Sequence, residues 1–255
     1  MLEMKDSPKL TIGWFGTSIM EHFEAYNQQM CDQSNLPEVG SQVIVESWRH
    51  KGYVQRLSLD LQVTWPQVDF TVDNQGLSGA TSRDILAKVR RIATETRYDL
   101  VFLSCGINDV WRGFQGRQEE AVAEDEFARN YTELIQQLKS CARVVVCLAE
   151  TPFGVIDEPI EVADMNRDLS AYNKIAAEIT DKANVPFLDV SVAFTAVANE
   201  WARAELRQSS KKDIKSLWSD GAHLSELGDA LMSRQVGDFL QQQQIVPLLL
   251  LKEPL

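Results

Sequence analysis

Short apolar segments alternate with amphipathic segments along most of the chain. Apolar runs rich in β-branched and aromatic residues predict buried strands at residues 10–15, 68–72, 100–104, 143–148 and 185–189. Apolar residues at helical spacing predict helices over residues 81–96, 126–139, 165–183 and 226–241. Strands that alternate with helices of this length are typical of a parallel sheet covered on both faces. We therefore expect a three-layer α/β/α sandwich with a five-stranded parallel sheet, of the flavodoxin-like kind.

Three segments interrupt this alternation. Residues 28–51 begin polar and then alternate, which predicts an insertion after the first helix, such as a hairpin. Residues 113–124 predict a polar, charged loop. The apolar residues 245–251 are too few to span a bilayer, and they predict a terminal segment docked on the core. A dimer contact or a flap near the site are the alternatives for this end. No linker stands out, so we expect a single domain over residues 1–255 that carries the insertion.

Composition and charge narrow the class of partners. A hydrophobic content of 44% and a charged content of 24% are ordinary for a soluble globular protein. The formal net charge of −12 argues against a nucleic-acid partner, which needs a basic patch. The sequence contains no run of about 18 apolar residues, so no membrane span is predicted. The first ten residues lack the apolar core of a signal peptide. We therefore expect a cytoplasmic location, and we leave a homo-oligomer open.

The cysteines give no sign of a metal or redox centre. They are Cys31, Cys105, Cys141 and Cys147, and no CxxC pair occurs among them. Cys105 and Cys147 lie in apolar runs, where a free thiol usually packs as a small hydrophobe. We therefore expect neither a metal site nor an organic cofactor.

Histidine is the usual general base near neutral pH, and the chain has only three: His22, His50 and His223. Asp220 precedes His223 by three residues, a spacing that lets a turn bring the carboxylate to Nδ1 of the imidazole. Such a bond would leave Nε2 free as a base. The structural alternative is that Asp220 or Ser225 merely caps the helix that begins near residue 226.

Ser18 directly follows the first predicted strand and begins a helix. Ligands of open parallel sheets bind beyond the carboxyl ends of the strands, and a helix N-terminus favours a developing oxyanion. The structural alternative is a helix cap without chemistry. Two further loops leave the same edge of the sheet: residues 73–82 are rich in glycine, and residues 105–109 include the amide of Asn108. Together they supply the donors that acyl transfer requires.

These blocks resemble the GDSL/SGNH hydrolase family, which is named for a Ser, a Gly, an Asn and a His in separate motifs. The resemblance implies that Ser18 is the nucleophile and that Asp220 and His223 complete the triad. It also implies an oxyanion hole formed by Ser18, Gly79 and Asn108. The blocks occur in family order over residues 12–228. One position departs from the pattern, because Thr17 stands where the family usually has Asp, and a hydroxyl hydrogen bond could replace that support.

Other residues near these blocks are candidates for the pocket. Ile19 and Trp111 are expected to bind substrate, although Trp111 could equally pack under its loop while Arg112 is solvated. Residues 150–153, at the end of the fourth predicted strand, are a further candidate border of the pocket. His22 is expected to be a surface or core residue without a catalytic role.

The resemblance implies a carboxylesterase or acylhydrolase that acts on a small-molecule ester through an acyl-enzyme intermediate. Two alternatives share the scaffold: a catalytically impaired binding protein, and an acyltransferase that uses the same triad. A flavin or nucleotide binder is the alternative at the level of the fold, but it leaves Asn108, Asp220 and His223 unexplained. Short-chain esters, acetylated sugars, lysophospholipids and thioesters all remain open as substrates.

Overall fold

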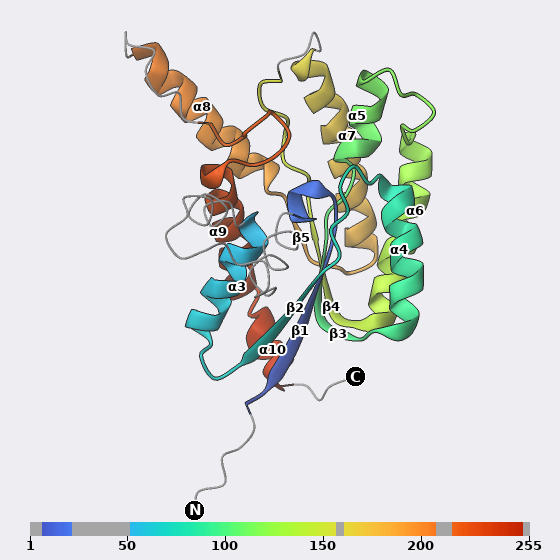
Figure 1. Ribbon diagram of the computed structural model, residues 1–255, viewed down its shortest axis with the longest axis vertical. Coiled ribbons are helices and arrows are strands. Elements are labelled where there is room, and N and C mark those ends of the chain that lie inside the picture. Colours follow the sequence, from blue (N-terminus) through green and yellow to red (C-terminus); the bar gives the residue numbers. More distant parts are fainter. Residues whose placement is uncertain (1–6, 22–51, 157–160, 208–215, 252–255) are drawn as a thin grey trace, which may run out of the picture.

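The computed structural model describes residues 7–21, 52–156, 161–207 and 216–251, which form a parallel sheet between two layers of helices (Figure 1). The strands are β1 (Lys9–Phe15), β2 (Asp69–Asn74), β3 (Tyr98–Leu103), β4 (Ala142–Leu148) and β5 (Phe187–Leu188). They pair in the order β2-β1-β3-β4-β5, and every pair is parallel. From β1 the chain first adds β2 on one side of that strand, and it then returns to add β3, β4 and β5 on the other side. This reversal places a topological switch point at the carboxyl end of β1.

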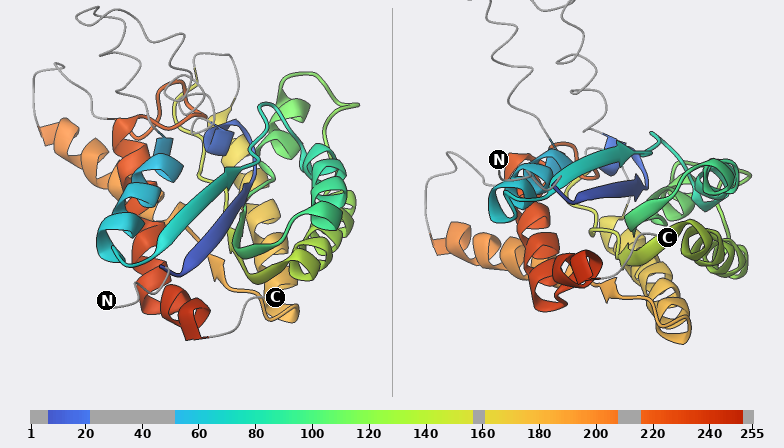
Figure 2. Two further views of the ribbon diagram at one scale, coloured as in Figure 1. Left: turned by 60° about the horizontal axis from the view of Figure 1, so that its bottom comes forward. Right: turned by 90° about the horizontal axis from the view of Figure 1, so that it is seen from below.

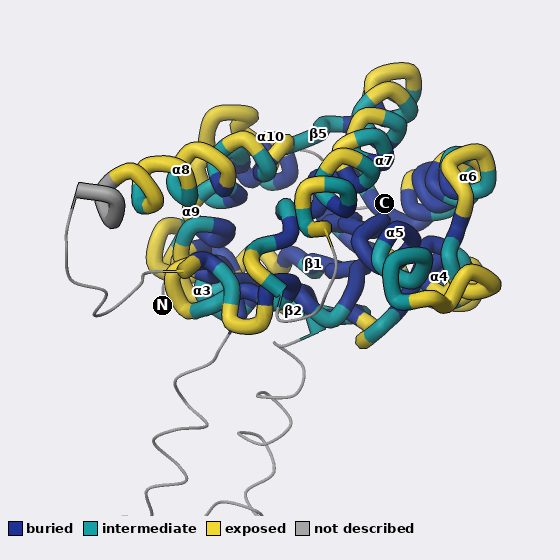
Figure 3. The backbone as a smooth tube through the Cα atoms, turned by 90° about the horizontal axis from the view of Figure 1, so that it is seen from above, coloured by how far each residue is buried: buried dark blue, intermediate teal, exposed yellow. Residues whose placement is uncertain are grey.

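Helices cover both faces of the sheet (Figures 2 and 3). One layer holds α4 (Ser82–Glu95), α5 (Ile107–Phe114), α6 (Glu124–Cys141) and α7 (Val162–Lys182). The other holds α3 (Gly52–Thr64), α9 (Glu226–Gln242) and α10 (Ile245–Leu251), with α8 (Ser191–Arg207) beside α9. Figure 3 shows buried residues on the sides of α3, α6 and α9 that face the sheet, whereas α8 is mostly exposed or intermediate. The predicted α/β/α sandwich with a five-stranded parallel sheet is therefore confirmed.

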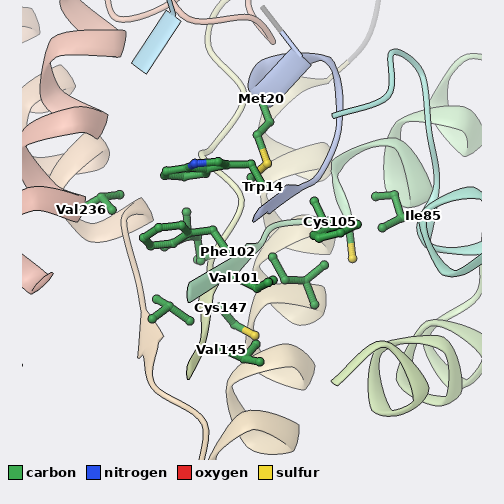
Figure 4. Close-up of a cluster of buried hydrophobic side chains, with 14 of the residues drawn as sticks. Trp14, Met20, Ile85, Val101, Phe102, Cys105, Val145, Cys147 and Val236 are labelled. Atoms are coloured by element: carbon green, nitrogen blue, oxygen red, sulfur yellow. The ribbon is translucent and has the colours of Figure 1, made fainter. Parts of the chain in front are cut away.

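The central strands carry the core between these layers (Figure 4). The Trp14 ring stacks on Phe102 with centroids 4.0 Å apart, and Tyr53 of α3 meets Trp14 edge-on at 5.7 Å. Consecutive side chains of a strand point to opposite faces, so Val101 packs toward the other helical layer. Both central strands are buried on each face, which holds their carboxyl ends rigidly beneath the loops that follow.

Several boundaries differ from those predicted. The last strand is only Phe187–Leu188 rather than residues 185–189, because Pro186 has no N–H to extend the ladder at this edge of the sheet. Helices α3, α5 and α8 were not predicted. Helix α5 includes the first two residues of the predicted loop 113–124, and α6 begins at its last residue. Short or weakly periodic helices of this kind give little pattern to recognise.

The apolar end of the chain forms helix α10. Ile245, Val246 and Leu249 are buried in the core, and the Arg143 guanidinium donates to the Leu249 carbonyl at 2.6 Å. The predicted docking of this segment is confirmed. In the described part of the chain, no helix is long and apolar enough to cross a membrane. The predicted insertion at 28–51, together with His22, Cys31 and His50, lies outside the described residues.

Candidate active site

Ser18 lies just beyond the carboxyl end of β1, where residues 18–21 are helical. The Thr17 carbonyl accepts hydrogen bonds from the amides of Met20 at 3.0 Å and Glu21 at 3.1 Å, which begins this helical turn. Thr17 is buried, whereas Ser18 is half-buried. The chain therefore turns sharply at the topological switch point and exposes the serine side chain there.

His223 and Asp220 approach Ser18 from the loop that precedes α9. Nε2 of His223 lies 2.8 Å from Oγ of Ser18, and Nδ1 lies 2.6 Å from Oδ2 of Asp220. The other Asp220 oxygen accepts from the amides of His223 at 2.7 Å and Ala222 at 3.0 Å. Ser225 caps α9, accepting from two of its first amides. The capping role is thus taken by Ser225, and the Asp220 carboxylate faces the imidazole.

The electrostatics of Asp220 favour its charged form. Burial raises the pKa of this carboxyl, but hydrogen bonds from the His223 ring and from the amides of His223 and Ala222 outweigh burial and lower the pKa below its ordinary value. An ionised Asp220 accepts a hydrogen bond from a protonated Nδ1. The lone pair of Nε2 is then left to accept a hydrogen bond from the Ser18 hydroxyl. This arrangement can withdraw the serine proton and hold it on an imidazolium.

The loop that carries Asp220 and His223 has a sharp turn at Gly221. Gly221 has φ +90°, and its carbonyl accepts from the Gly154 amide at 2.7 Å. A Cβ at Gly221 would lie 2.4 Å from the Val155 carbonyl oxygen. The loop after β4 therefore holds the histidine loop in place through contacts that only a glycine permits.

The substitution Gly221→Ala should displace Asp220 and His223 together. We expect kcat for ester hydrolysis to fall at least roughly tenfold, because small misplacements of a catalytic group are costly. The matched control is Gly116→Ala, where φ is +74° but no heavy atom lies within 4 Å of the added Cβ. Both variants carry backbone strain of about 1–2 kcal/mol in thermal unfolding. Equal kcat values for the two variants would contradict this role for the turn.

The two predicted donor loops meet at the Ser18 turn. The backbone amide of Leu77 donates to the Gly16 carbonyl at 3.0 Å. The side-chain Nδ2 of Asn74 donates to the Met20 carbonyl at 2.7 Å. Asn108 lies in the first turn of α5, and its side-chain Nδ2 donates to the Ala80 carbonyl at 2.9 Å. These bonds connect the loops after β1, β2 and β3, so that side chains far apart in sequence share one site.

Gly79 and Asn108 lie on the two loops that meet at the Ser18 turn, and their role as an oxyanion hole stays a prediction. Gly79 has φ +70°, and its carbonyl accepts from Nη2 of Arg112 at 2.8 Å. Arg112 is therefore not simply a solvated residue, since it supports the Gly79 loop. An amide nitrogen carries two hydrogens, so the bond from Asn108 to Ala80 leaves a second N–H for a ligand.

Two buried carboxyl groups lie beneath these loops. Asp109 accepts from the Ser82 amide at 2.9 Å, and burial raises its pKa to about 6. Burial, and next the charge of Asp109, raise the pKa of Glu150 to about 8, although bonds from the Ser104 hydroxyl and the Ile107 amide oppose the shift. Glu150 was predicted to border the pocket, but it is 3% exposed and lies behind the nucleophile loop.

The residues predicted to bind substrate have different surroundings from those expected. Ile19 is 8% exposed and lines a small cavity behind Ser18, where it belongs to the core. Trp111 packs edge-on against Phe153 with centroids 5.8 Å apart, and both join the core. Packing under the loop is thus what the structure shows for Trp111, and a substrate contact by either residue remains a prediction.

Sequence reasoning missed the support given by Gly221, Gly154, Arg112 and Asp109. Their roles depend on contacts between loops that are distant in the chain, for which no local pattern exists. Only the glycine of the Asp-Gly-Ala-His block carried a signal, since glycine often marks a left-handed turn. Among the residues that the structure describes, no group of three or more His, Cys, Asp and Glu side chains could hold a metal ion.

A flavodoxin-like sheet whose first loop carries a serine bonded to a histidine–aspartate pair defines an SGNH-type ester hydrolase scaffold. The chain belongs to the GDSL-like lipase/acylhydrolase family of ester hydrolases, because the family model matches residues 15–231. The membership predicted from the four motifs is therefore confirmed.

Similar proteins come from the same family of folds. The acetylxylan esterase of Geobacillus stearothermophilus is 30% identical over 148 residues, which are 57% of this chain and 66% of that protein, just under two thirds. The crystal structure of an acetylxylan esterase from this organism superposes with a TM-score of 0.64 at 23% identity, covering 93% of this chain and 95% of the other. An α/β hydrolase from the metagenome of Lake Arreo gives a TM-score of 0.61 at 20% identity, covering 91% and 94%. At these identities the structural likeness shows the fold alone.

Proposed function

We propose that the protein hydrolyses acyl esters with Ser18 as nucleophile, His223 as general base and Asp220 as its orienting carboxylate. The observation that carries the proposal is the continuous hydrogen-bonded chain from Ser18 Oγ through the His223 ring to Asp220, at 2.8 and 2.6 Å. Nucleophile, base and orienting group lie within hydrogen-bond reach of each other, as acyl transfer requires.

The reaction proceeds in two halves. Oγ of Ser18 attacks the ester carbonyl while Nε2 of His223 takes its proton, and the tetrahedral oxyanion lies among the N–H groups of Ser18, Gly79 and Asn108. The C–O bond to the alcohol then breaks, and the imidazolium protonates the leaving oxygen, which leaves an acyl-serine. A water molecule then gives a proton to Nε2 and attacks the acyl-serine. The second tetrahedral intermediate collapses, which releases the carboxylic acid while the imidazolium returns its proton to Ser18 Oγ.

We further propose that the substrate is a short-chain ester, above all an acetyl ester of a carbohydrate. The similarity to an acetylxylan esterase supports this class. So does the exposure of the triad, since the Asp220 and His223 side chains are 54% and 27% exposed and leave room for a large polar alcohol. The same exposure argues against the catalytically impaired binding protein, whose pocket would be closed.

The test is a comparison of substrates with different acyl groups and alcohols. We expect kcat/KM for acetyl esters, including acetylated xylooligosaccharides, to exceed that for octanoyl esters at least roughly tenfold. Product analysis with added alcohol separates hydrolysis from acyl transfer. Faster turnover of octanoyl esters would overturn the substrate class, and a dominant transesterified product would favour the acyltransferase.

A further inference from the structure

A small cavity lies directly behind the turn that carries Ser18. Its volume is about 10 Å³, close to the minimum that holds one water molecule. Polar and apolar side chains line it together, namely Thr17, Ile19, Tyr53, Ser104, Glu150 and Thr151. Thr17 and Ile19 are the immediate neighbours of the nucleophile, so anything that changes in this cavity acts on the nucleophile turn.

Within the described part of the chain, two polar atoms on the cavity wall have no hydrogen-bond partner. They are Oε1 of Glu150 and Oγ1 of Thr151, on residues that are 3% and 2% exposed. A buried polar group without a partner is costly, and such groups are commonly paired through an enclosed water. A carboxylic acid can donate to that water, whereas a carboxylate can only accept.

Burial and the neighbouring acid favour the uncharged form of Glu150 and outweigh the opposing effects of Ser104 and Ile107. Asp109 of α5 faces it, and the charge of Asp109 acts on Glu150 next after burial. The phenols of Tyr53 in α3 and Tyr131 in α6, and the Cys105 thiol, also face it, and burial raises the pKa of each well above its ordinary value. These three groups stay neutral near pH 8 and bring no positive charge to offset an ionised Glu150.

Asp229 of α9 is the remaining acid near the cavity. It acts on Tyr53 from the other helical layer, and burial raises its own pKa to about 7. The Arg56 charge opposes that shift, so a cation faces Asp229 as well as the apolar core. Asp229 thus belongs to the helical layer of α9, whereas Glu150 follows β4.

We propose that Glu150 is a positioning residue that works in its uncharged acid form, holding the Ser18 and Asn108 loops through one enclosed water, and that its ionisation weakens oxyanion stabilisation. The inference rests on the proposed function of the Ser18 site. The Glu150 side chain lies against the loop that carries Asn108, since a Cβ added at Gly106 would come within 3.8 Å of Glu150 Cγ. A negative charge in this low-dielectric position repels the oxyanion that forms on the other side of the loop.

The sign of the pH dependence follows from the direction of the Glu150 shift. The pKa of this carboxyl is raised to about 8, so the acid form dominates below that pH and the carboxylate above it. We expect kcat for acetyl ester hydrolysis to hold up to about pH 8 and then to fall roughly tenfold. KM should change less, because the repulsion acts on charge that appears only in the transition state.

The decisive variant is Glu150→Gln, which keeps the shape and the polar atoms but cannot ionise. We expect kcat at pH 7 to stay within about threefold of wild type and the alkaline fall to disappear. The matched control Glu95→Gln removes an exposed carboxyl at the end of α4 and should keep the wild-type profile. An alkaline fall that persists unchanged in Glu150→Gln, or a wild-type profile that stays flat up to pH 10, would overturn the proposal.

Infrared spectroscopy of the wild-type protein tests the same titration without relying on the folding of a variant. The carbonyl band of a protonated carboxyl should vanish with the same midpoint as kcat, and a band already absent at pH 7 contradicts the proposal. Failure of this proposal is distinguishable from failure of the proposed function. If Ser18→Ala lost activity while the wild-type pH profile was flat, the assignment of Ser18 as nucleophile would stand and only the role of Glu150 would be wrong.

Discussion

Replacing Ser18 by alanine is expected to lower kcat for acetyl ester hydrolysis by roughly 10⁴–10⁶-fold. The reason is that the reaction passes through an ester of the serine oxygen. Without Oγ, His223 and Asp220 retain their mutual bond but have no nucleophile to activate. What remains is the contribution of the oxyanion donors and of substrate binding, which act on water alone. Acetate release under single-turnover conditions measures the loss directly.

The Ser18→Ala variant should fold as the wild type does, because Ser18 is half-buried and its hydroxyl bonds to the partly exposed His223 ring. Labelling with a fluorophosphonate probe gives an independent readout, since only an activated serine reacts. Ser140→Ala, on the exposed end of α6, is the matched control and should keep both labelling and turnover. Residual labelling of Ser18→Ala at the wild-type rate would show that another residue is the nucleophile.

Replacing Asn108 by alanine is expected to lower kcat by roughly 10²–10³-fold with a much smaller change in KM. The side chain is 4% exposed and is held by its bond to the Ala80 carbonyl, so its second N–H is already oriented before substrate arrives. A donor that is oriented in advance acts most strongly on charge that develops in the transition state, and its loss therefore appears in kcat.

The same substitution also removes the bond between the loops after β2 and β3. We therefore expect a loss of stability of about 1 kcal/mol, measured as a lower midpoint of urea unfolding. Asn199→Ala on the exposed face of α8 controls for loss of an amide as such. If Asn108→Ala raised KM while kcat stayed constant, the amide would bind the ground state, and its assignment to the oxyanion hole would be wrong.

The fold was predictable to the level of its layers and strands. The central strands are buried on both faces, so their sequences are nearly continuous apolar runs that stand out from the amphipathic helices. The last strand was overestimated because Pro186 interrupts pairing at the edge of the sheet, an effect that depends on which neighbour lies beside it. Helix α5 was missed because it is short and begins within the Asn108 motif.

The residues of the candidate site were predictable from the sequence, whereas the contacts that hold them in place were not. Ser18, Gly79, Asn108, Asp220 and His223 stand in motifs whose spacing is visible along the chain. Ile19 was predicted as a substrate contact because it neighbours Ser18; it is buried among core residues, and the substrate contact stays a prediction. Glu150 looked like a border of the pocket because it ends a strand, yet the α5 loop covers it.

The sequence by itself determined the class of fold, the order of its strands along the chain, and the residues for which acyl transfer is proposed. Periodicity and motif spacing are local properties, so they can be read without knowing which segments meet. Only the tertiary structure decided that Ser18 bonds to His223 across 205 positions of sequence, that Arg112 supports Gly79, and that Glu150 is buried behind the Ser18 turn, where burial raises its pKa. Ionisation and hydrogen bonding depend on neighbours brought together by packing, and no local pattern contains that information.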